Sequence, residues 1–426
     1  MFGLLNKRNK AVSSSTDIDI DGSFGYLEKD VYYFDSACQT LRPIEIINAE
    51  KDYYYNYNAC GHRVKYEWGK KVDKAVDQTR EDLLKLAGKT DKEFTVAFSL
   101  NATSSMNMIL HQLNVEDYDQ IITTEWEHSS VFLPSLTWAK RNNKPRLVLT
   151  RDESGKLIYE LEKIKKSILI LNSNNNFDGR SSANLHQLVD DVKKGEGVVI
   201  IDGCQTFGHH PELLEKLNFD AACGSGHKMY GPSIGFAVIR KQLVRNMDTY
   251  LIGGSTIADN SIDQYELIDD EHEMYARLEP GLQNFAGIIG LGSAIRWRRN
   301  WVLGQNLDKD QIEKYNLNQK MKAAEYENWL AEYLNKKLQT VEDLVLLNSK
   351  PSSVVSVYFN KLDSNRLGQF VSEKNIMART GYHCCYYYLK HLKDYPALFR
   401  VSLGLQNTPS QIDFLIEQLQ YLSKLA

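Results

Sequence analysis

Between about residues 80 and 240, short apolar runs rich in β-branched residues alternate with longer amphipathic stretches. The clearest runs are FTVAFS at 94–99, QIITT at 120–124, SILILN at 167–172 and VVIID at 198–202. Continuous apolar strands of this length are typical of a parallel sheet whose two faces are both covered by helices. The alternation therefore predicts an α/β domain with a mainly parallel sheet.

The remaining chain predicts two further parts. With 426 residues, the protein exceeds the size that a single hydrophobic core normally supports. Helical periodicity without strand runs at 284–300 and 319–338 indicates a helix that leaves the sheet domain and a second, smaller α+β domain. We expect an N-terminal arm at 1–30, a large domain at 31–295 and a small C-terminal domain at 296–426.

Charge and cysteine content exclude several classes of protein. The net charge is −4, whereas a protein that tracks nucleic-acid phosphates normally has a basic excess. The first ten residues lack the apolar run of a signal peptide, and no apolar segment is long enough to cross a membrane. The six cysteines lack the spacing of a disulfide framework or a zinc site. We expect a cytoplasmic protein without a metal, acting on small molecules or proteins.

Two residues near the expected sheet edge carry the strongest chemical signal. Asp202 ends a buried-type strand, and Lys228 lies among small residues in GSGHKMYGP. Ligands of open α/β sheets bind beyond the carboxyl ends of the strands. An amine nucleophile and a nearby carboxylate are the pair that pyridoxal phosphate needs. Taken singly, Asp-Gly is a common turn and a lysine in a glycine-rich loop is usually solvated.

The combination of DGCQ with GSGHKMYGP resembles the cofactor-lysine region of the class V aminotransferase-like enzymes, and among them the SUF-type cysteine desulfurases and selenocysteine lyases. The resemblance runs from about residue 31 to the C-terminus. It implies the type I fold of pyridoxal phosphate-dependent transferases, a homodimer, and pyridoxal 5'-phosphate bound through Lys228.

The resemblance also assigns contacts to the cofactor. The segment LNATSSMN is similar to the family's phosphate-binding turn, with the Thr103 hydroxyl and the Ala102 and Thr103 amides as donors; an ordinary helix N-cap is the alternative. In EWEHSS, His128 matches the imidazole that stacks on the cofactor ring. The other matched positions are Asn176 and Gln205 at the phenolic oxygen, Asp202 at the ring nitrogen, and Ser225 and His227 at the phosphate. Asn175 next to Asn176 leaves a one-residue error open.

Substrate contacts follow by the same resemblance. The segment YYFDSACQTLRP includes Ala37, and YYYNYNACGHR ends in His62 and Arg63, in a loop that reaches toward the substrate, often from the neighbouring subunit. Arg400 in FRVSLGLQ matches the guanidinium that holds the substrate carboxylate bidentately. Arg379 is expected nearby.

The segment ARTGYHCCYYYLK resembles the one that carries the desulfurase's attacking thiol, which falls on Cys384. A catalytic thiol needs a lowered pKa, and Arg379 or His383 could act as the cation or donor that provides it. A buried structural cysteine is the alternative. Cys385 has no counterpart in the family and could instead resolve or protect a persulfide.

The expected activity is L-cysteine desulfuration, which forms L-alanine and a persulfide on Cys384 for transfer to a sulfur acceptor, such as an iron–sulfur assembly protein. A selenocysteine lyase or another sulfur lyase is the alternative within the enzyme class. A non-catalytic assembly subunit is the alternative outside it, because Leu282 replaces a family threonine and the loop after the lysine is one residue shorter. Ser255 and Thr256 replace family glycines and are uncertain members of the site.

Overall fold

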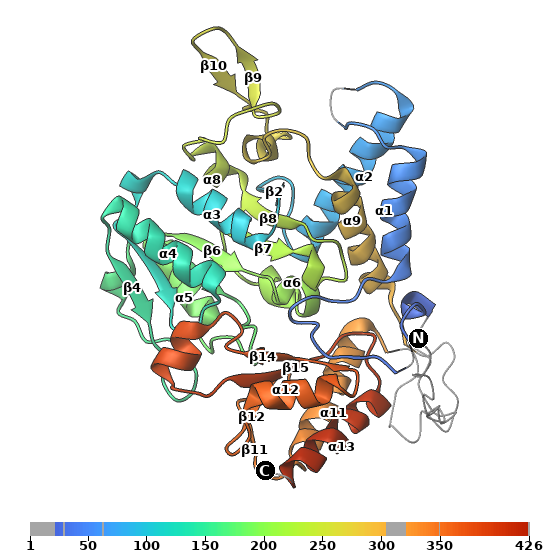
Figure 1. Cartoon of the computed structure of the whole chain (residues 1–426). Coiled ribbons are helices and arrows are strands. Elements are labelled where there is room, and N and C mark those ends of the chain that lie inside the picture. The colour runs from blue at the N-terminus through green and yellow to red at the C-terminus, as the bar shows by residue number, and fades with distance from the viewer. Residues whose placement is uncertain (1–21, 29, 62–63, 304–320, 349, 425–426) are drawn as a thin grey trace, which may run out of the picture.

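The computed structural model describes residues 22–28, 30–61, 64–303, 321–348 and 350–424. They form a large domain built on a seven-stranded sheet and a small domain below it in the view of Figure 1. A two-stranded hairpin, β9 (Ile257–Asn260) with β10 (Tyr265–Leu267), projects from the large domain.

The sheet of the large domain has the strand order β2-β8-β7-β6-β5-β3-β4. The pairs from β7 to β4 are all parallel, and β8 is antiparallel to both of its neighbours. The prediction of a mainly parallel sheet is confirmed. The strands are β2 (Phe94–Ser99), β3 (Gln120–Thr124), β4 (Arg146–Leu149), β5 (Ser167–Asn172), β6 (Val198–Asp202), β7 (Ala221–Ser225) and β8 (Gly235–Arg240).

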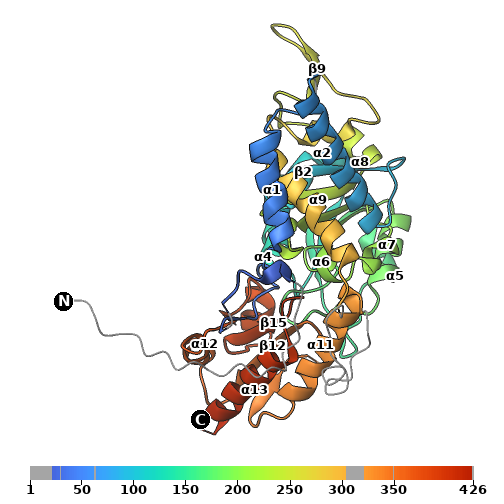
Figure 2. The same cartoon turned by 90° about the vertical axis from the view of Figure 1, so that its right-hand side faces the viewer.

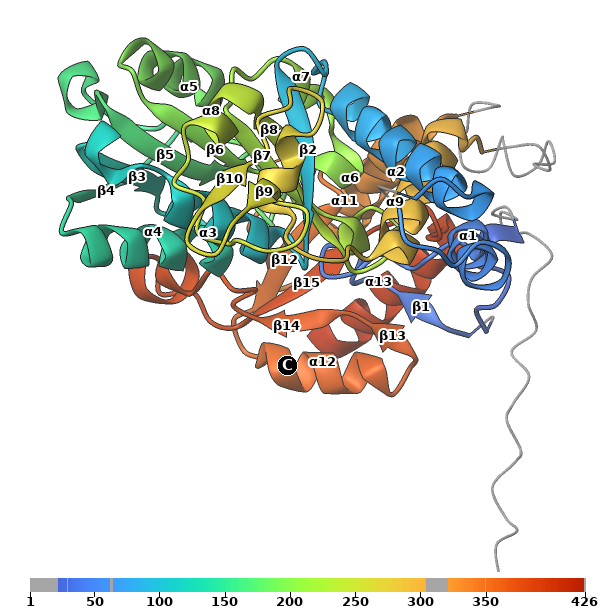
Figure 3. The same cartoon turned by 90° about the horizontal axis from the view of Figure 1, so that it is seen from above.

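Helices cover both faces of this sheet, as the continuous apolar strands require. Along β5, Leu169 and Leu171 join the core under one helix layer, whereas Ile168 and Ile170 join the core under the other. Figure 2 shows α1, α2 and α9 side by side, and Figure 3 shows α3 and α4 on the opposite side of the strands from α5. The helices are α1 (Ile44–Asn56), α2 (Glu67–Leu86), α3 (Ala102–Gln112), α4 (Ser129–Asn142), α5 (Leu185–Lys194), α6 (Thr206–His209), α7 (Glu212–Glu215), α8 (Lys241–Arg245) and α9 (Phe285–Asn300).

The small domain is an antiparallel sheet of order β11-β12-β15-β14 with helices packed against it. Its last helix begins at a capping box in which Thr408 and Gln411 satisfy each other's backbone amides. Its elements are α11 (Ala323–Leu338), β11 (Leu344–Leu346), β12 (Val354–Phe359), α12 (Ser364–Ser372), β14 (Arg379–Gly381), β15 (Leu398–Ser402) and α13 (Pro409–Ser423).

The segment before α1 packs differently from its predicted assignment to the large domain. Phe24 and Phe34 are buried in the core of the small domain. The short strand β1 (Tyr32–Tyr33) pairs in parallel with β13 (Ile376–Met377). The reason is that both phenylalanines pack into the apolar core of the small domain and the backbone of Phe34 bonds to Met377 and Ser402 of that domain. Residues 1–21 of the predicted arm lie outside the described residues.

A buried carboxylate on α11 ties the two domains together. Glu327 accepts a hydrogen bond from the Tyr230 hydroxyl at 3.1 Å and from Arg298 Nη2 at 2.7 Å, and His209 Nδ1 lies 3.3 Å away. Burial alone would raise the pKa of Glu327, but the charges of Arg298 and His209 outweigh burial and lower it to about 2. The ionised form is therefore the one that the folded protein stabilises.

We expect Glu327→Gln to destabilise the protein by about 3 kcal/mol near neutral pH, because it leaves Arg298 buried without its counter-charge. The free carboxyl titrates near 4.5 and the folded one near 2, so wild type has this stabilisation above about pH 4.5 and loses it as the pH falls toward 2. Denaturant unfolding across this pH range should show that the difference in the free energy of unfolding between the variant and wild type becomes smaller as the pH falls. Glu332→Gln, at an exposed position of α11, serves as the control. A difference in the free energy of unfolding that did not change with pH would contradict the assignment of Glu327 as an ionised partner of Arg298.

Candidate active site

A cavity of about 290 Å³ lies at the carboxyl edge of the large sheet, where the small domain covers it. It brings together most of the residues predicted for the site: Ala37, Ala102, Thr103, His128, Asn176, Asp202, Ser225, His227, Lys228, Arg379 and Arg400. The same lining also includes Cys38, Asn101, Ser130, Cys204 and His383. His62 and Arg63 lie outside the described residues.

Strand topology explains why Asp202 and Lys228 line the same cavity. Asp202 is the last residue of β6, and its neighbour β7 ends at Ser225, directly before the helical turn Gly226–Lys228. Parallel neighbours end at the same sheet edge, so both side chains reach the same cavity. Asp202 is 6% exposed, and its Oδ1 accepts a hydrogen bond from the Cys204 amide at 3.0 Å. The edge therefore has a buried carboxylate and a lysine on adjacent strands.

The N-terminus of α3 lines the same cavity. Asn101 caps the helix by accepting a hydrogen bond from the Ser104 amide at 2.9 Å. Ala102 and Thr103 are the first two helical residues, and the Thr103 hydroxyl lies 2.6 Å from the Ser130 hydroxyl. Amides in a first helical turn have no partner within the helix, and the helix dipole favours an anion there.

Two histidines of the site are neutral near neutral pH. Burial, followed by the charge of Lys228, lowers the pKa of His128 and of His227 to about 4 each. His128 caps α4, since its Nδ1 accepts a hydrogen bond from the Ser130 amide at 3.1 Å. His227 Nδ1 lies 3.1 Å from the Ser225 hydroxyl. Both rings are therefore held by hydroxyl or amide partners rather than by ion pairs.

The two candidate asparagines have different roles. Asn175 Oδ1 accepts hydrogen bonds from the amides of residues 177–179, and its amide group donates to Asp178 at 2.6 Å. The side-chain hydrogen bonds of Asn175 are thus all made within its own turn. Asn176 lines the cavity, donates to the His383 carbonyl at 2.7 Å and accepts from the Cys385 thiol at 3.0 Å. The geometry favours Asn176 as the site residue.

Gln205 lies behind the lining rather than in it. Its Nε2 donates to the Ala37 carbonyl at 2.9 Å, and its buried Oε1 has no hydrogen-bond partner among the described residues. It therefore fastens the segment around Ala37 to the end of β6.

Two arginines lie opposite each other on neighbouring strands, since Arg379 of β14 pairs with Arg400 of β15. Arg400 is 1% exposed, and it donates from Nη2 to Asp35 at 2.6 Å and from Nη1 to the Asn176 carbonyl at 2.9 Å. Its Nε is buried without a partner among the described residues. Arg379 donates from Nη1 to Cys38 Sγ at 3.0 Å.

Cys384 does not line the cavity in this conformation. Its carbonyl accepts hydrogen bonds from the Ser129 amide and hydroxyl, both at 2.8 Å, and His383 and Cys384 both have left-handed backbone angles, with φ of 46° and 60°. Burial, followed by the charges of Arg400 and Arg379, lowers the pKa of His383 to about 2. The His383 ring is therefore neutral near neutral pH. It can act on the Cys384 thiol as a hydrogen-bond donor but not as a cation, which was the other predicted role.

Cys385 is a buried structural thiol. It is 1% exposed, donates to Asn176 and packs with Trp126 and Phe177. Burial raises its pKa well above the ordinary value.

Two of the positions at which this sequence differs from the family pattern, Leu282 and Thr256, are not part of the cavity lining. Leu282, in place of the family threonine, is 76% exposed. Thr256 is buried and bonds within its own turn to the amide and carbonyl of Gly253, which gives it a structural role.

Sequence reasoning missed Cys38 as a site residue. The only signal for it was its position next to Ala37 in the segment YYFDSACQTLRP.

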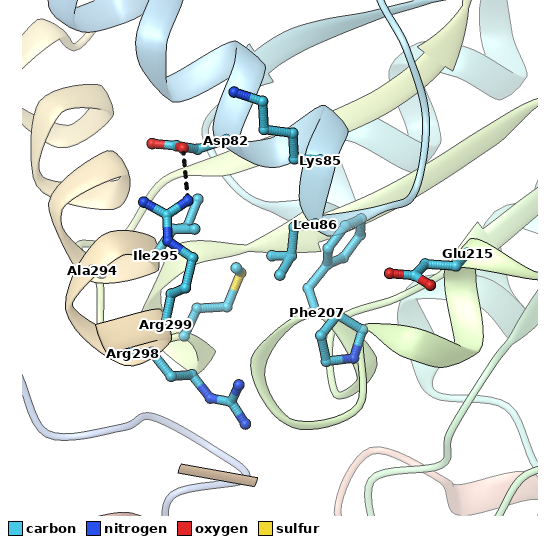
Figure 4. A pocket seen from close by; sticks show the side chains of 11 residues that line it. Asp82, Lys85, Leu86, Phe207, Glu215, Ala294, Ile295, Arg298 and Arg299 are labelled. Carbon is cyan, nitrogen blue, oxygen red and sulfur yellow. Dashed lines mark hydrogen bonds and ion pairs between the residues drawn. The ribbon is translucent and has the colours of Figure 1, made fainter. Parts of the chain in front are cut away.

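A second pocket lies between α2, α9 and the turn around Phe207, with an ion pair between Arg299 and Asp82 at its rim (Figure 4). Its walls are mostly apolar, with Leu86, Phe207 and Ile295 among them. Lys85 and Glu215 line it, but it lacks the strand-end carboxylate and the helix N-terminus that the first cavity has beside its lysine.

The residues of the first cavity fit pyridoxal 5'-phosphate. A lysine for the aldehyde, a buried carboxylate for the ring nitrogen and a helix N-terminus for the phosphate share one cavity. Arg400, which lines the cavity, has a buried Nε without a partner among the described residues, so it offers a further polar group to a ligand there. Among the described residues no cluster of three or more His, Cys, Asp or Glu could hold a metal ion, and no helix has the length and hydropathy to cross a membrane.

Comparison with known proteins gives one family. The sequence model of the family Aminotransferase class-V matches residues 32–415. A cysteine desulfurase of Escherichia coli (strain K12 / DH10B) is 27% identical over 402 residues, covering 92% of this chain and 93% of the relative.

Solved structures share the fold. The apo structure of a cysteine desulfurase from Thermococcus onnurineus NA1 has a TM-score of 0.80 at 24% identity, covering 96% of this chain and 97% of that one. The cysteine desulfurase CsdA from Escherichia coli, in an S-sulfonic acid form, has a TM-score of 0.79 at 23% identity, covering 95% and 97%.

Proposed function

Since the chain belongs to the class-V aminotransferase family, we propose that it is a pyridoxal 5'-phosphate-dependent L-cysteine desulfurase. The observation that carries this proposal is the shared cavity of Lys228, Asp202, the α3 N-terminus and two arginines. Relatives named cysteine desulfurase that match along nearly the whole chain support the choice of reaction within the family.

The cofactor, when bound, supplies an electron sink for the bonds that break at the amino acid. Lys228 would hold its aldehyde and then move the proton of the substrate Cα. Asp202 would keep the ring nitrogen protonated, and by resemblance the neutral His128 ring would stack on the cofactor ring. Ala102, Thr103, Ser225 and His227 would hold the phosphate, and by resemblance Asn176 and Gln205 would serve the phenolic oxygen, Asn176 from the cavity lining and Gln205 from behind it.

The arginines orient the amino acid. Arg400 has an Nε without a partner among the described residues, and the carboxylate of the substrate competes with Asp35 for its Nη2. Arg379 lies beside it on the neighbouring strand. Two guanidiniums at one end of the cavity favour an α-carboxylate there. By resemblance, Ala37, His62 and Arg63 complete the substrate site.

Cys384 carries the persulfide that is handed to an acceptor protein. Cys384 is partly exposed, and the residue before it in the chain, His383, lines the cavity. His383 and Cys384 both have left-handed backbone angles, and backbone strain of this kind clusters at functional sites.

The enzyme works as a homodimer in the cytoplasm. Leu282 and Leu100 expose about three quarters of their surface, and Leu100 and Leu251 line one hollow with Gln283. Exposed apolar side chains of this kind mark a protein interface. All six cysteines are free, which fits a reducing compartment.

The decisive experiment incubates the purified protein, loaded with pyridoxal phosphate, with L-cysteine and measures alanine and protein-bound persulfide. Both products should appear in equal amounts in the first turnover. Alanine with free sulfide but no persulfide would indicate a lyase, and preference for L-selenocysteine would indicate a selenocysteine lyase. Absence of any product would favour a non-catalytic subunit.

Asp202→Asn is expected to lower the rate of alanine formation by about 10²–10³-fold, because a neutral amide no longer stabilises the charge on the ring nitrogen. The exchange is nearly isosteric, so the melting temperature and cofactor content should stay close to wild type. Steady-state kinetics with L-cysteine measure the effect, with Asp190→Asn on the exposed face of α5 as the control. Unchanged turnover would show that another group faces the ring nitrogen.

A further inference from the structure

Two thiols line the cavity, Cys38 and Cys204, whereas Cys384 is not part of the lining. Cys38 Sγ accepts a hydrogen bond from Arg379 Nη1 at 3.0 Å. The same cavity wall includes Lys228 and Arg400. A substrate amino acid whose carboxylate lies at the two arginines therefore has Cys38 among its nearest protein neighbours.

The turn that carries Cys38 is rigidly attached to the site. The Cys38 amide donates to the Asp35 carbonyl at 3.0 Å, and Asp35 in turn holds Arg400. The preceding carbonyl of Ala37 accepts from Gln205, and the Thr40 amide donates to the His227 carbonyl at 2.8 Å. Hydrogen bonds on both sides thus hold the Cys38 sulfur at one place, as a reacting group needs.

Polar atoms without partners show where a ligand would lie beside this sulfur. His383 is 3% exposed and lines the cavity, and neither of its ring nitrogens has a hydrogen-bond partner among the described residues. Arg400 Nε is buried and unpartnered in the same way. Buried polar atoms are nearly always hydrogen-bonded, so these atoms indicate a bound polar molecule next to Cys38.

The other cysteine in the lining is a poor nucleophile. Cys204 is buried, and burial followed by the charge of Asp202 raises its pKa well above the ordinary value. Cys38 is partly exposed and has a guanidinium as its partner, an environment typical of reactive cysteines.

We propose that Cys38 is a second catalytic thiol, which takes the sulfur of L-cysteine inside the cavity and passes it to Cys384. The inference rests on the proposed desulfurase function. In the first step the Cys38 sulfur forms a bond to the substrate sulfur while the substrate's Cβ–S bond breaks. The electron pair of that bond goes to Cβ, which gains a proton as the Cys38 thiol loses one.

The products of this step are alanine and a Cys38 persulfide, so sulfur is oxidised as Cβ is reduced and no external oxidant is needed. In the second step the Cys384 thiol attacks the outer sulfur of the persulfide. A new S–S bond forms on Cys384, the old one breaks, and Cys38 recovers its thiol and proton. The relay carries sulfur from the closed cavity to the loop from which an acceptor can collect it.

The test maps persulfide by mass spectrometry after one turnover of the holoenzyme with L-cysteine. In Cys384→Ala, the persulfide should accumulate on Cys38 together with one equivalent of alanine. In Cys38→Ala, persulfide formation on Cys384 should slow by roughly 10²-fold, because the positioned nucleophile is lost. Cys223→Ala, which removes a buried thiol of β7 outside the cavity lining, should behave as wild type.

The visible absorption of the lysine-bound cofactor establishes that each variant is folded and loaded. Persulfide on Cys384 at the wild-type rate in Cys38→Ala would overturn the relay, as would the absence of persulfide from Cys38 in Cys384→Ala. Neither result would affect the desulfurase proposal, which fails only if the wild-type holoenzyme forms no alanine from L-cysteine.

Discussion

Lys228→Ala is expected to abolish turnover of L-cysteine and to remove the covalently held cofactor. Among the lysines of the described chain, Lys228 lines the cavity, directly after the strand next to Asp202. Without its amine, the cofactor aldehyde has no attachment point and the substrate Cα proton has no nearby base. Alanine formation should fall to background, which corresponds to the loss of both a covalent and a proton-transfer step.

Borohydride reduction of the wild-type holoenzyme, followed by peptide mapping, should place the pyridoxyl mass on Lys228. The matched control is Lys216→Ala, an exposed lysine of the same domain, which should retain full activity and cofactor. A pyridoxyl label on a different lysine would show that the cavity has been assigned to the wrong chemistry.

Cys384→Ala is expected to reduce sustained sulfur transfer to an acceptor thiol to background, while cofactor binding stays intact. Neither Lys228 nor Arg400 changes in this variant, so L-cysteine still binds and the first turnover still forms alanine. The enzyme then stops, because the sulfur remains in the cavity on Cys38. Radiolabelled L-cysteine and a small-molecule thiol acceptor distinguish the first turnover from the later ones.

Cys385→Ser is the control for this experiment, because serine can still donate to Asn176 Oδ1 and Cys385 lies away from the cavity lining. It should retain most of the sulfur transfer. If Cys385 proved essential and Cys384 dispensable, the register of the segment GYHCCYYY would be off by one residue.

The sheet was predictable from the sequence because its strands are buried on both faces. β2, β3, β5 and β6 coincide with the apolar runs at 94–99, 120–124, 167–172 and 198–202. The strand β7, of sequence AACGS, was missed, because alanine, cysteine and glycine have no β-branched signal. Its place between β6 and β8 is imposed by its neighbours, whose backbone groups need partners.

Domain membership before α1 could not be predicted from local pattern. Phe24 and Phe34 both join the core of the small domain, and nothing in their spacing along the sequence tells which core they join. The choice depends on long-range contacts, such as the bridge between Asp35 and Ser402.

Several features were predictable from the sequence alone: the α/β sheet, the lysine and aspartate at its carboxyl edge, and the candidate arginine and cysteine segments near the C-terminus. Such features lie in short stretches, where residue type and order carry the information. Only the tertiary structure shows which thiols line the cavity, namely Cys38 and Cys204 but not Cys384. Cys38 and Cys384 lie far apart in the chain, and the strand pairing that puts Arg379 opposite Arg400 also brings Arg379 to Cys38. A local sequence pattern cannot specify such contacts, because they form only when both domains close over the sheet edge.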